Sequence, residues 1–256
     1  MTEAAQFSTD LTGQTILVTG ATSGLGKRFA EVLALSGAAV AISGRRVDRL
    51  DALAAEINGA GGVCAPVPID MTDSDSILAA VETASEALGT ITGLVNNAGI
   101  PDAQRAHKMS IELIDRVFDT NLRGPWILSC EVAKRMIDAG VGGRMVNISS
   151  VAARNYSGNG AALYSTTKAG VIRMTETLAV EWARFGINVN AIAPGAFHSE
   201  MMDGMLERMG DISKMFPRGR LGEPSQLDST LLFFMSPSSE FVTGSVIIAD
   251  DGQSPR

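Results

Sequence analysis

Tyr164 and Lys168 are the residues of this sequence whose types and spacing are best suited to acid–base chemistry. They lie four positions apart in a segment with helical spacing, so their side chains should share one helix face. A tyrosine hydroxyl ordinarily titrates at about 10. A neighbouring ammonium group should lower that pKa toward neutral pH, as a general acid or base requires. The spacing is common by chance, and an ordinary surface helix is the alternative for the pair taken alone.

A glycine-rich turn after residues 15–19 is the second feature whose residue types point to a chemical role. Glycines permit a tight turn and let a ligand approach the backbone, and a helix N-terminus offers free N–H groups to a phosphate. The spacing GxxxGxG alone could be a structural turn, but its place after a first strand favours dinucleotide binding. The candidate residues are Gly20, Thr22, Ser23, Gly24, Leu25 and Gly26.

Two arginines, Arg45 and Arg46, end the second apolar run where many NAD-binding folds carry a carboxylate for the ribose 2′-hydroxyl. A guanidinium group matches the geometry of a phosphate. We therefore expect NADP(H) as the preferred cofactor, while NAD(H) stays possible. Solvated loop charges are the alternative for both arginines.

These candidate residues need elements that bring them together, and the apolar pattern provides alternating strands and helices. The strands are apolar on both faces, as in a parallel sheet covered by helices on each side. The pattern predicts one α/β domain over residues 1–256, with a doubly wound, parallel, seven-stranded sheet. The expected strands are residues 15–19, 39–43, 63–69, 91–96, 144–149, 187–192 and 245–249. The expected helices are residues 25–36, 47–57, 74–88, a long stretch ending near 139, and 161–185.

Residues 196–217 interrupt the last crossover at the carboxyl end of a strand, where open α/β sheets bind ligands. The segment is rich in methionine, which adapts to varied apolar partners. We interpret it as a lid for a hydrophobic or bulky substrate, with helix packing as the alternative. The substrate candidates are Met201, Met202, Met205 and, from another loop, Tyr156, which could equally cap the core. Asp102 and Arg105 are weaker candidates for the pocket's rim.

Further motifs follow in a fixed order between about Gly13 and Gly252: Asn96-Asn97-Ala98-Gly99, Asn121, Ser149-Ser150 and Pro194-Gly195. With the glycine turn and the Tyr164–Lys168 pair, they make the chain resemble the short-chain dehydrogenase/reductase family in its shorter, single-domain form. The resemblance implies a Rossmann-like fold and hydride transfer between a nicotinamide and a carbonyl or CH–OH carbon.

The resemblance also implies catalytic roles. Tyr164 would exchange a proton with the substrate oxygen, and Ser150 would hydrogen-bond that oxygen. Lys168 would hold the nicotinamide ribose and tune Tyr164. Asn121 would anchor a water that relays protons to solvent through Lys168.

Cofactor roles follow from the same resemblance. Asp70 and the adjacent Met71 would lie at the adenine edge. The segment Asn97, Ala98 and Gly99 would line the adenine ribose and brace the sheet. The nicotinamide side would be formed by Pro194, Gly195, Phe197 and Ser199.

Two features depart from the family's pattern. The step from Ser150 to Tyr164 is one residue longer than usual, so either the loop 152–162 has an extra residue or Ser149 replaces Ser150. The closing turn reads Asp250-Asp251-Gly252, where the family usually has DGG, and we expect only a local effect.

Composition excludes several other classes. The net charge of -7 argues against a general nucleic-acid or anionic-membrane surface. Two separated cysteines and two histidines cannot build a disulfide framework or a histidine-rich metal centre, so no metal is expected. We find no signal peptide or membrane-length apolar run, and the cytoplasm is the expected location.

Several functions stay open at this level. The leading hypothesis is an NADP(H)-dependent ketone reductase or alcohol dehydrogenase. The alternatives are an NAD-dependent sugar, polyol or 3-hydroxyacyl dehydrogenase and, more remotely, a non-catalytic dinucleotide sensor. Residues 111–139 and 161–185 carry more apolar positions than one sheet face needs, and the family's equivalent helices pair across subunits, so we expect a homotetramer.

Overall fold

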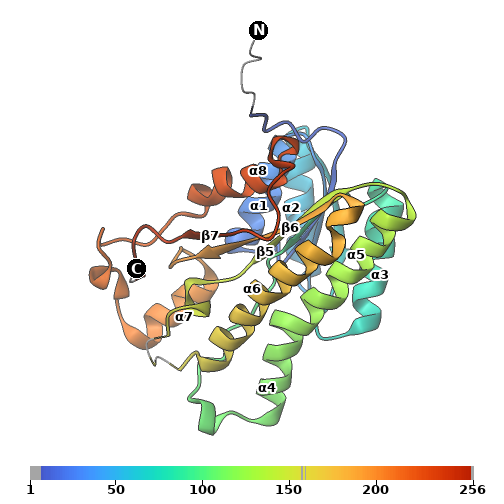
Figure 1. Ribbon diagram of the computed structural model, residues 1–256. Coiled ribbons are helices and arrows are strands. Elements are labelled where there is room, and N and C mark those ends of the chain that lie inside the picture. The colour runs from blue at the N-terminus through green and yellow to red at the C-terminus, as the bar shows by residue number, and fades with distance from the viewer. Residues whose placement is uncertain (1–6, 157, 159, 255–256) are drawn as a thin grey trace.

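Seven parallel strands form the centre of the computed structural model, which describes residues 7–156, 158 and 160–254 (Figure 1). Their order across the sheet is β3-β2-β1-β4-β5-β6-β7. The chain thus moves outward from β1 to β3 and returns to place β4 beside β1. The strands are β1 (Thr15–Thr19), β2 (Ala39–Gly44), β3 (Val63–Pro68), β4 (Gly93–Asn96), β5 (Gly143–Ile148), β6 (Ile187–Pro194) and β7 (Val246–Ala249).

Helices cover both faces of this sheet, which confirms the doubly wound, Rossmann-like α/β fold (Figure 1). One layer contains α1 (Gly24–Leu35), α2 (Val47–Gly59) and α8 (Asp228–Met235). The other contains α3 (Ser74–Leu88), α5 (Gly124–Asp138) and α6 (Ala162–Trp182). Along β1, Ile16 and Val18 pack into one buried cluster and Leu17 into the other. This alternation is why the strands carry apolar residues on both faces.

The long helical stretch ending near residue 139 contains an unexpected feature. It consists of α4 (Ile111–Phe118), a π-helical turn (Asp119–Arg123) and α5 without a break. The N–H of Gly124 donates to Asp119, five residues back. A Cβ atom at Gly124 would lie 2.4 Å from the carbonyl oxygen of Met71, so close packing requires glycine there. The wider turn contains Asn121, one of the candidate site residues.

The segment after β6 contains α7 (Glu200–Met209) and a 3₁₀ helix (Ile212–Met215). Strand β6 runs two residues further than the sequence pattern predicts, because Ala193 and Pro194 still pair with Ile248 and Ala249 of β7. This extension carries the lid to the carboxyl edge of the sheet. Within the described residues, no helix is long and apolar enough to cross a membrane, and no cluster of side chains is suited to a metal ion.

Candidate active site

The carboxyl ends of the central strands bring most candidate residues to one edge of the sheet. Strand β1 leads into the glycine turn, β4 into Asn97, and β5 into Ser149 and Ser150. Strands β1 and β4 are neighbours from which the chain departs in opposite directions across the sheet. Open α/β sheets bind ligands at such a switch point.

Tyr164 and Lys168 share one face near the start of α6, as their spacing predicts. The Lys168 Nζ atom lies 5.7 Å from the centre of the Tyr164 ring. Lys168 is 4% exposed, and its ammonium group donates a 2.7 Å hydrogen bond to the carbonyl oxygen of Ile148, the last residue of β5. A strand end therefore fixes the position of the ammonium group beside the tyrosine.

The two serines after β5 have different partners. The Ser149 hydroxyl is buried and donates to the carbonyl oxygen of Lys168 at 2.8 Å. The Ser150 hydroxyl instead hydrogen-bonds the Tyr164 hydroxyl and accepts from the N–H of Ala152 at 3.1 Å. Ser150 is thus the serine that faces Tyr164, despite the longer loop between them.

The ionisation of this pair differs from the sequence-based expectation. Burial raises the pKa of Tyr164, and nearby Asp102 adds to this effect, although the hydrogen bond from Ser150 acts in the opposite direction. Burial also lowers the pKa of Lys168 to about 8. The pKa of Tyr164 is thus shifted in the opposite direction to the expectation, because loss of hydration on burial is the largest cause. Tyr164 carries its proton at neutral pH.

Asn121 lies near Lys168 but its side chain is already engaged. Its Oδ1 accepts from the N–H of Ile100 at 2.8 Å, and its Nδ2 donates to the carbonyl oxygen of Ile100 at 2.9 Å. A Cβ atom on Gly99 would lie 3.4 Å from Lys168 Nζ and 3.5 Å from Asn121 Oδ1. The small residue at 99 leaves space between these two groups.

Asp102 has a structural role that the sequence did not reveal. This carboxylate is 3% exposed, and its Oδ2 accepts from the backbone N–H groups of Leu163 and Tyr164 at 2.8 and 3.1 Å. It therefore caps the N-terminus of α6 from a distant loop, where a negative charge also favours the helix dipole. The sequence signal was weak, because the helix's own N-cap residue, Ala161, has no capping group.

The glycine turn is fixed against the segment after β4. The Thr19 hydroxyl accepts from the N–H groups of Asn97 and Ala98, both at 3.0 Å. In return, Asn97 Nδ2 donates to the carbonyl oxygens of Thr19 and Gly20. A Cβ atom on Gly26 would lie 2.2 Å from the Gly20 oxygen, so helix α1 can follow the turn only with glycine there.

The arginines after β2 point to different groups. Arg45 lies close enough to Asp70 to lower the pKa of that carboxylate, although the larger cause is the hydrogen bond from the Thr72 backbone. Arg46 turns back to the glycine turn, where its Nη2 donates to the hydroxyls of Thr22 and Ser23 at 2.6 and 3.0 Å. The Met71 side chain is buried in the core, so only its backbone is available to a ligand at this edge.

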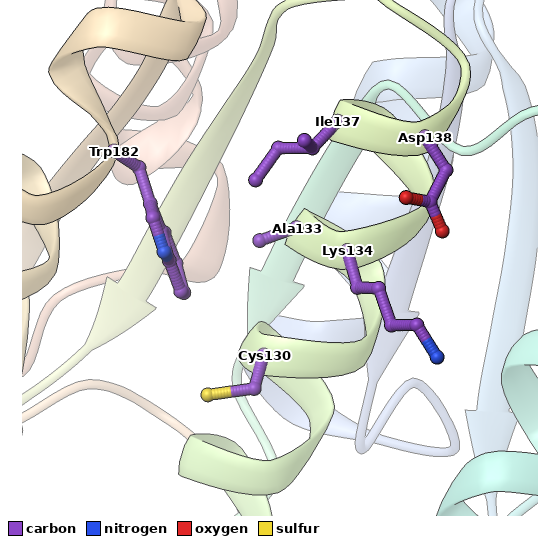
Figure 2. A pocket seen from close by; sticks show the side chains of 6 residues that line it. All are labelled: Cys130, Ala133, Lys134, Ile137, Asp138 and Trp182. Carbon is purple, nitrogen blue, oxygen red and sulfur yellow. The ribbon is translucent and has the colours of Figure 1, made fainter.

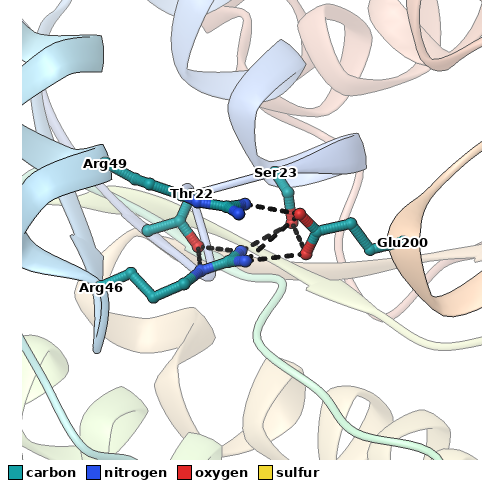
Figure 3. Close-up of polar contacts among 5 residues, drawn as sticks. All are labelled: Thr22, Ser23, Arg46, Arg49 and Glu200. Atoms are coloured by element: carbon teal, nitrogen blue, oxygen red, sulfur yellow. Dashed lines mark hydrogen bonds and ion pairs between the residues drawn. The ribbon is translucent and has the colours of Figure 1, made fainter.

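Arg46 also contacts a residue that lies 154 positions later in the chain (Figure 3). Glu200, the first residue of α7, accepts from Arg46 Nη1 at 2.9 Å, from Arg49 Nη1 at 2.5 Å and from the Ser23 hydroxyl at 3.1 Å. The hydrogen bond from Arg49, with weaker contributions from Arg46 and Ser23, lowers the pKa of Glu200 to about 2. Sequence reasoning missed Arg49 and Glu200, because the pair forms only when the lid folds over the glycine turn.

The start of the lid lies directly on the glycine turn. A Cβ atom on Gly24 would be 3.1 Å from the Cβ of Ser199, whose hydroxyl caps α7. The Phe197 ring is buried against Gly222 and belongs to the core cluster of the α1, α2 and α8 layer. Tyr156 and Met201 are exposed. Met202 and Met205 are half-buried.

The residues just after the lid form ion pairs with the closing turn of the chain. Asp251 forms ion pairs with Arg218 Nη1 at 3.2 Å and Arg220 Nε at 3.0 Å. Its backbone has a φ of 51°, a conformation that favours glycine. A Cβ atom on Gly195, after Pro194, would lie 2.3 Å from the side chain of Gln253, so this turn also packs tightly against the end of β6. The Asp251 side chain, which the DGG pattern lacks, thus contacts Arg218 and Arg220 just after the lid, and the local effect of this departure stays a prediction.

This set of donors fits a dinucleotide. Ser23 occupies the N-cap position of α1 but does not cap it with its side chain, and the helix N-terminus is suited to a pyrophosphate. Arg46 and Arg49 bring guanidinium groups to the neighbouring ribose position, where a phosphate would find bidentate partners.

Comparison with known families decides the classification. The family model described as short chain dehydrogenase matches residues 14–209. The chain belongs to this family. It is therefore a short-chain NAD(P)(H)-dependent oxidoreductase, and the resemblance inferred from the motifs is confirmed.

Individual members of the short-chain dehydrogenase family resemble this chain over nearly their whole length. It is 37% identical to the 3-oxoacyl-[acyl-carrier-protein] reductase FabG of Thermotoga maritima, covering 94% of this chain and 98% of that protein. It is 35% identical to the sorbitol dehydrogenase of Cereibacter sphaeroides, covering 94% and 98%.

Solved structures of the family have the same architecture. A short-chain type dehydrogenase/reductase from Mycobacterium marinum is 33% identical with a TM-score of 0.93, covering 97% of this chain and 98% of that one. A single-residue variant of the actinorhodin polyketide ketoreductase with NADPH is 31% identical with a TM-score of 0.90, covering 95% and 98%.

Proposed function

We propose that this short-chain dehydrogenase transfers a hydride between NADP(H) and a ketone or secondary alcohol. The observation that carries the chemistry is the Ser150–Tyr164–Lys168 arrangement, in which a neutral tyrosine hydroxyl meets a serine hydroxyl beside a buried ammonium group. Such a site can bind one oxygen atom with two hydroxyl groups and exchange a proton with it.

A bound nicotinamide would supply or accept the hydride, and the reaction needs four actions from the protein. Ser150 hydrogen-bonds the substrate oxygen, and Tyr164 gives that oxygen a proton during reduction or removes it during oxidation. Lys168 holds its ammonium group beside Tyr164, where it would also hydrogen-bond the ribose of a bound nicotinamide. Asn121, whose amide binds the Ile100 backbone, keeps the space beside Gly99 and Lys168 available for a water that relays the proton.

The preference for NADP(H) is supported by the guanidinium groups at the glycine turn. Arg46 donates to both Thr22 and Ser23, next to the end of β2 where a 2′-phosphate would lie. Arg45 is a second donor on the side of Asp70. A solved relative was crystallised with NADPH, which agrees with this proposal at 31% identity.

We propose a hydrophobic or bulky ketone as the substrate, with the half-buried Met202 and Met205 of α7 and the exposed Tyr156 and Met201 as apolar contacts. A second candidate is an NAD-dependent sugar, polyol or 3-hydroxyacyl dehydrogenase. It is favoured by the similarity to a protein named sorbitol dehydrogenase.

One experiment separates the candidates. Initial rates are measured with NADPH and NADH over a panel of cyclic, aromatic and acyl ketones and of keto sugars, with a Tyr164→Phe variant as control. The proposal predicts a clear preference for NADPH and for apolar ketones. A preference for NADH together with sugars would establish the second candidate instead.

The α4–α6 face suggests self-association, and we propose the homotetramer typical of the family. A groove of about 550 Å³ is lined by Phe118, Leu122, Trp126 and Met174 among others. A smaller hollow between α5 and α6 is lined by Cys130, Ile137 and Trp182 (Figure 2). Trp126 is 45% exposed and Val180 is 81% exposed. Light scattering should give a tetrameric mass that Trp126→Glu reduces, and a monomeric mass for the unmodified protein would refute the proposal.

A further inference from the structure

Glu200 is a carboxylate beside the glycine turn and the end of β2, where the two residues directly after the strand are Arg45 and Arg46. It belongs to the lid, and its oxygens accept from two arginines and from Ser23 (Figure 3). Glu200 thereby occupies the hydrogen-bond donors that a 2′-phosphate would need. A carboxylate and a phosphate use the same bidentate geometry toward guanidinium groups.

The Glu200 contact also places the start of the lid over the backbone that a bound cofactor would need. Glu200 follows Ser199, whose Cβ lies beside Gly24 of the turn. A pyrophosphate at the N-terminus of α1 needs the backbone that Ser199 approaches. Glu200 and Ser199 therefore belong to one connection between α7 and the turn, and a ligand that detaches Glu200 also frees the start of the lid.

We propose that Glu200 is a specificity-determining residue that occupies the place of the 2′-phosphate of NADP(H). The phosphate displaces the Glu200 carboxylate from Arg46 and Arg49 when NADP(H) binds. NAD(H), which has only a hydroxyl there, brings no group that competes with the Glu200 carboxylate for the guanidinium groups. The inference rests on the proposed cofactor site but not on the identity of the substrate.

The strength of the contact is consistent with displacement. The side chains of Arg46, Arg49 and Glu200 are 38%, 47% and 51% exposed. Ion pairs this exposed contribute little, and solvent screens them. A phosphate carries more charge and more acceptor oxygens than a carboxylate. It can therefore replace Glu200 without breaking any buried contact.

The test uses direct binding and needs no turnover. Calorimetric titrations compare adenosine 2′-monophosphate with adenosine 5′-monophosphate on the full-length protein, Glu200→Gln and Glu207→Gln. Glu207 is an exposed carboxylate of the same helix, and no salt bridge is seen for it among the described residues. It controls for the loss of one negative charge.

We expect Glu200→Gln to bind the 2′-phosphate about two- to fivefold more tightly than the unmodified protein, the range that exposed ion pairs are worth. Binding of the 5′-phosphate should not change, and Glu207→Gln should match the unmodified protein for both ligands.

Three results would overturn the inference: equal tightening for both ligands, weaker binding of the 2′-phosphate by Glu200→Gln, or identical affinities in all three proteins. The proposed function fails differently. If the 2′-phosphate binds none of the proteins while NADH does bind, the NADP(H) assignment is wrong whatever Glu200 does.

Discussion

The residues around Tyr164, which form the floor of the proposed active site, and the proposed lid are held by different kinds of interaction. Around Tyr164, buried groups bind backbone atoms: Lys168 donates to Ile148, and Asp102 accepts from the first turn of α6. The start of the lid is held by the exposed ion pairs of Glu200, and the residues just after the lid are held by ion pairs with the half-buried Asp251. A lost partner of a buried polar group costs about 1–3 kcal/mol, whereas an exposed ion pair is worth about 1 kcal/mol or less. The fold thus fixes the reacting groups and leaves the lid adjustable.

Tyr164→Phe should produce the largest effect on the floor. It removes the proton donor but keeps the ring, so we expect turnover to fall by about 10³-fold or more. Cofactor affinity should change little, because Lys168 keeps its bond to Ile148. Initial rates and a fluorescence titration with NADPH measure both quantities. Turnover within tenfold of the unmodified enzyme would overturn the assignment of Tyr164.

Lys168 should make the stability of the floor depend on pH. Its pKa is about 8 in the folded protein against an ordinary value of 10.5. Between these values the unfolded chain binds more protons, so the free energy of unfolding rises with pH. The rise attributable to Lys168 should be on the order of 2–3 kcal/mol between pH 8 and 10.

Urea denaturation of the unmodified protein and of Lys168→Met across this range measures that rise. The series stops at pH 10 because Tyr164, whose pKa is raised, contributes with the opposite sign above that value. The difference between the two free energies should grow with pH. Parallel curves would show that Lys168 is not desolvated in solution.

Asp102→Ala should have a smaller effect, on stability and on positioning. It leaves the N–H groups of Leu163 and Tyr164 without their acceptor, at a cost of about 2 kcal/mol. Because Tyr164 lies in the freed turn, kcat should fall more than KM rises. Asp102→Asn keeps one acceptor oxygen and should recover part of both losses. An unchanged melting temperature for Asp102→Ala would contradict the capping role.

The fold could be predicted from sequence because a parallel sheet covered on both sides has a simple signature. Strand β1 is buried at every position, and the predicted strand 15–19 matches it. The π-helical turn at Asn121 could not be predicted, since it depends on the close approach of Gly124 to the Met71 carbonyl. Local patterns carry no information about such long-range contacts.

The candidate site shows the same distinction between local patterns, which could be predicted, and long-range contacts, which could not. The spacing of Tyr164 and Lys168 correctly placed both side chains on one helix face. The pKa of Tyr164 is raised where a decrease was predicted, because its largest cause is burial, which is set by the whole fold. Glu200 and Arg49 are 151 residues apart, and no local pattern connects them. Sequence thus locates residues that act through local spacing but misses contacts across the lid.

The smallest expected effect is just beyond the lid, where Asp251 makes two opposing contributions to the free energy of unfolding. Its ion pairs with Arg218 and Arg220 stabilise the closing turn, while its φ of 51° costs energy relative to glycine, although less for Asp and Asn than for other side chains. Asp251→Gly removes both, so at low salt the free energy of unfolding should change by less than about 1 kcal/mol. At about 1 M NaCl the ion pairs are screened and only the backbone effect is left.

The glycine variant should then be the more stable protein by about 1 kcal/mol. Asp251→Asn, which tolerates this φ but lacks the charge, separates the two effects: it should be less stable than the unmodified protein at low salt and equal to it at high salt. Urea denaturation at both salt concentrations measures these differences. If the unmodified protein stays more stable than Asp251→Gly in high salt, Asp251 stabilises the closing turn through interactions other than its ion pairs. The contacts of Asp251 and those of Glu200 would then be of different types.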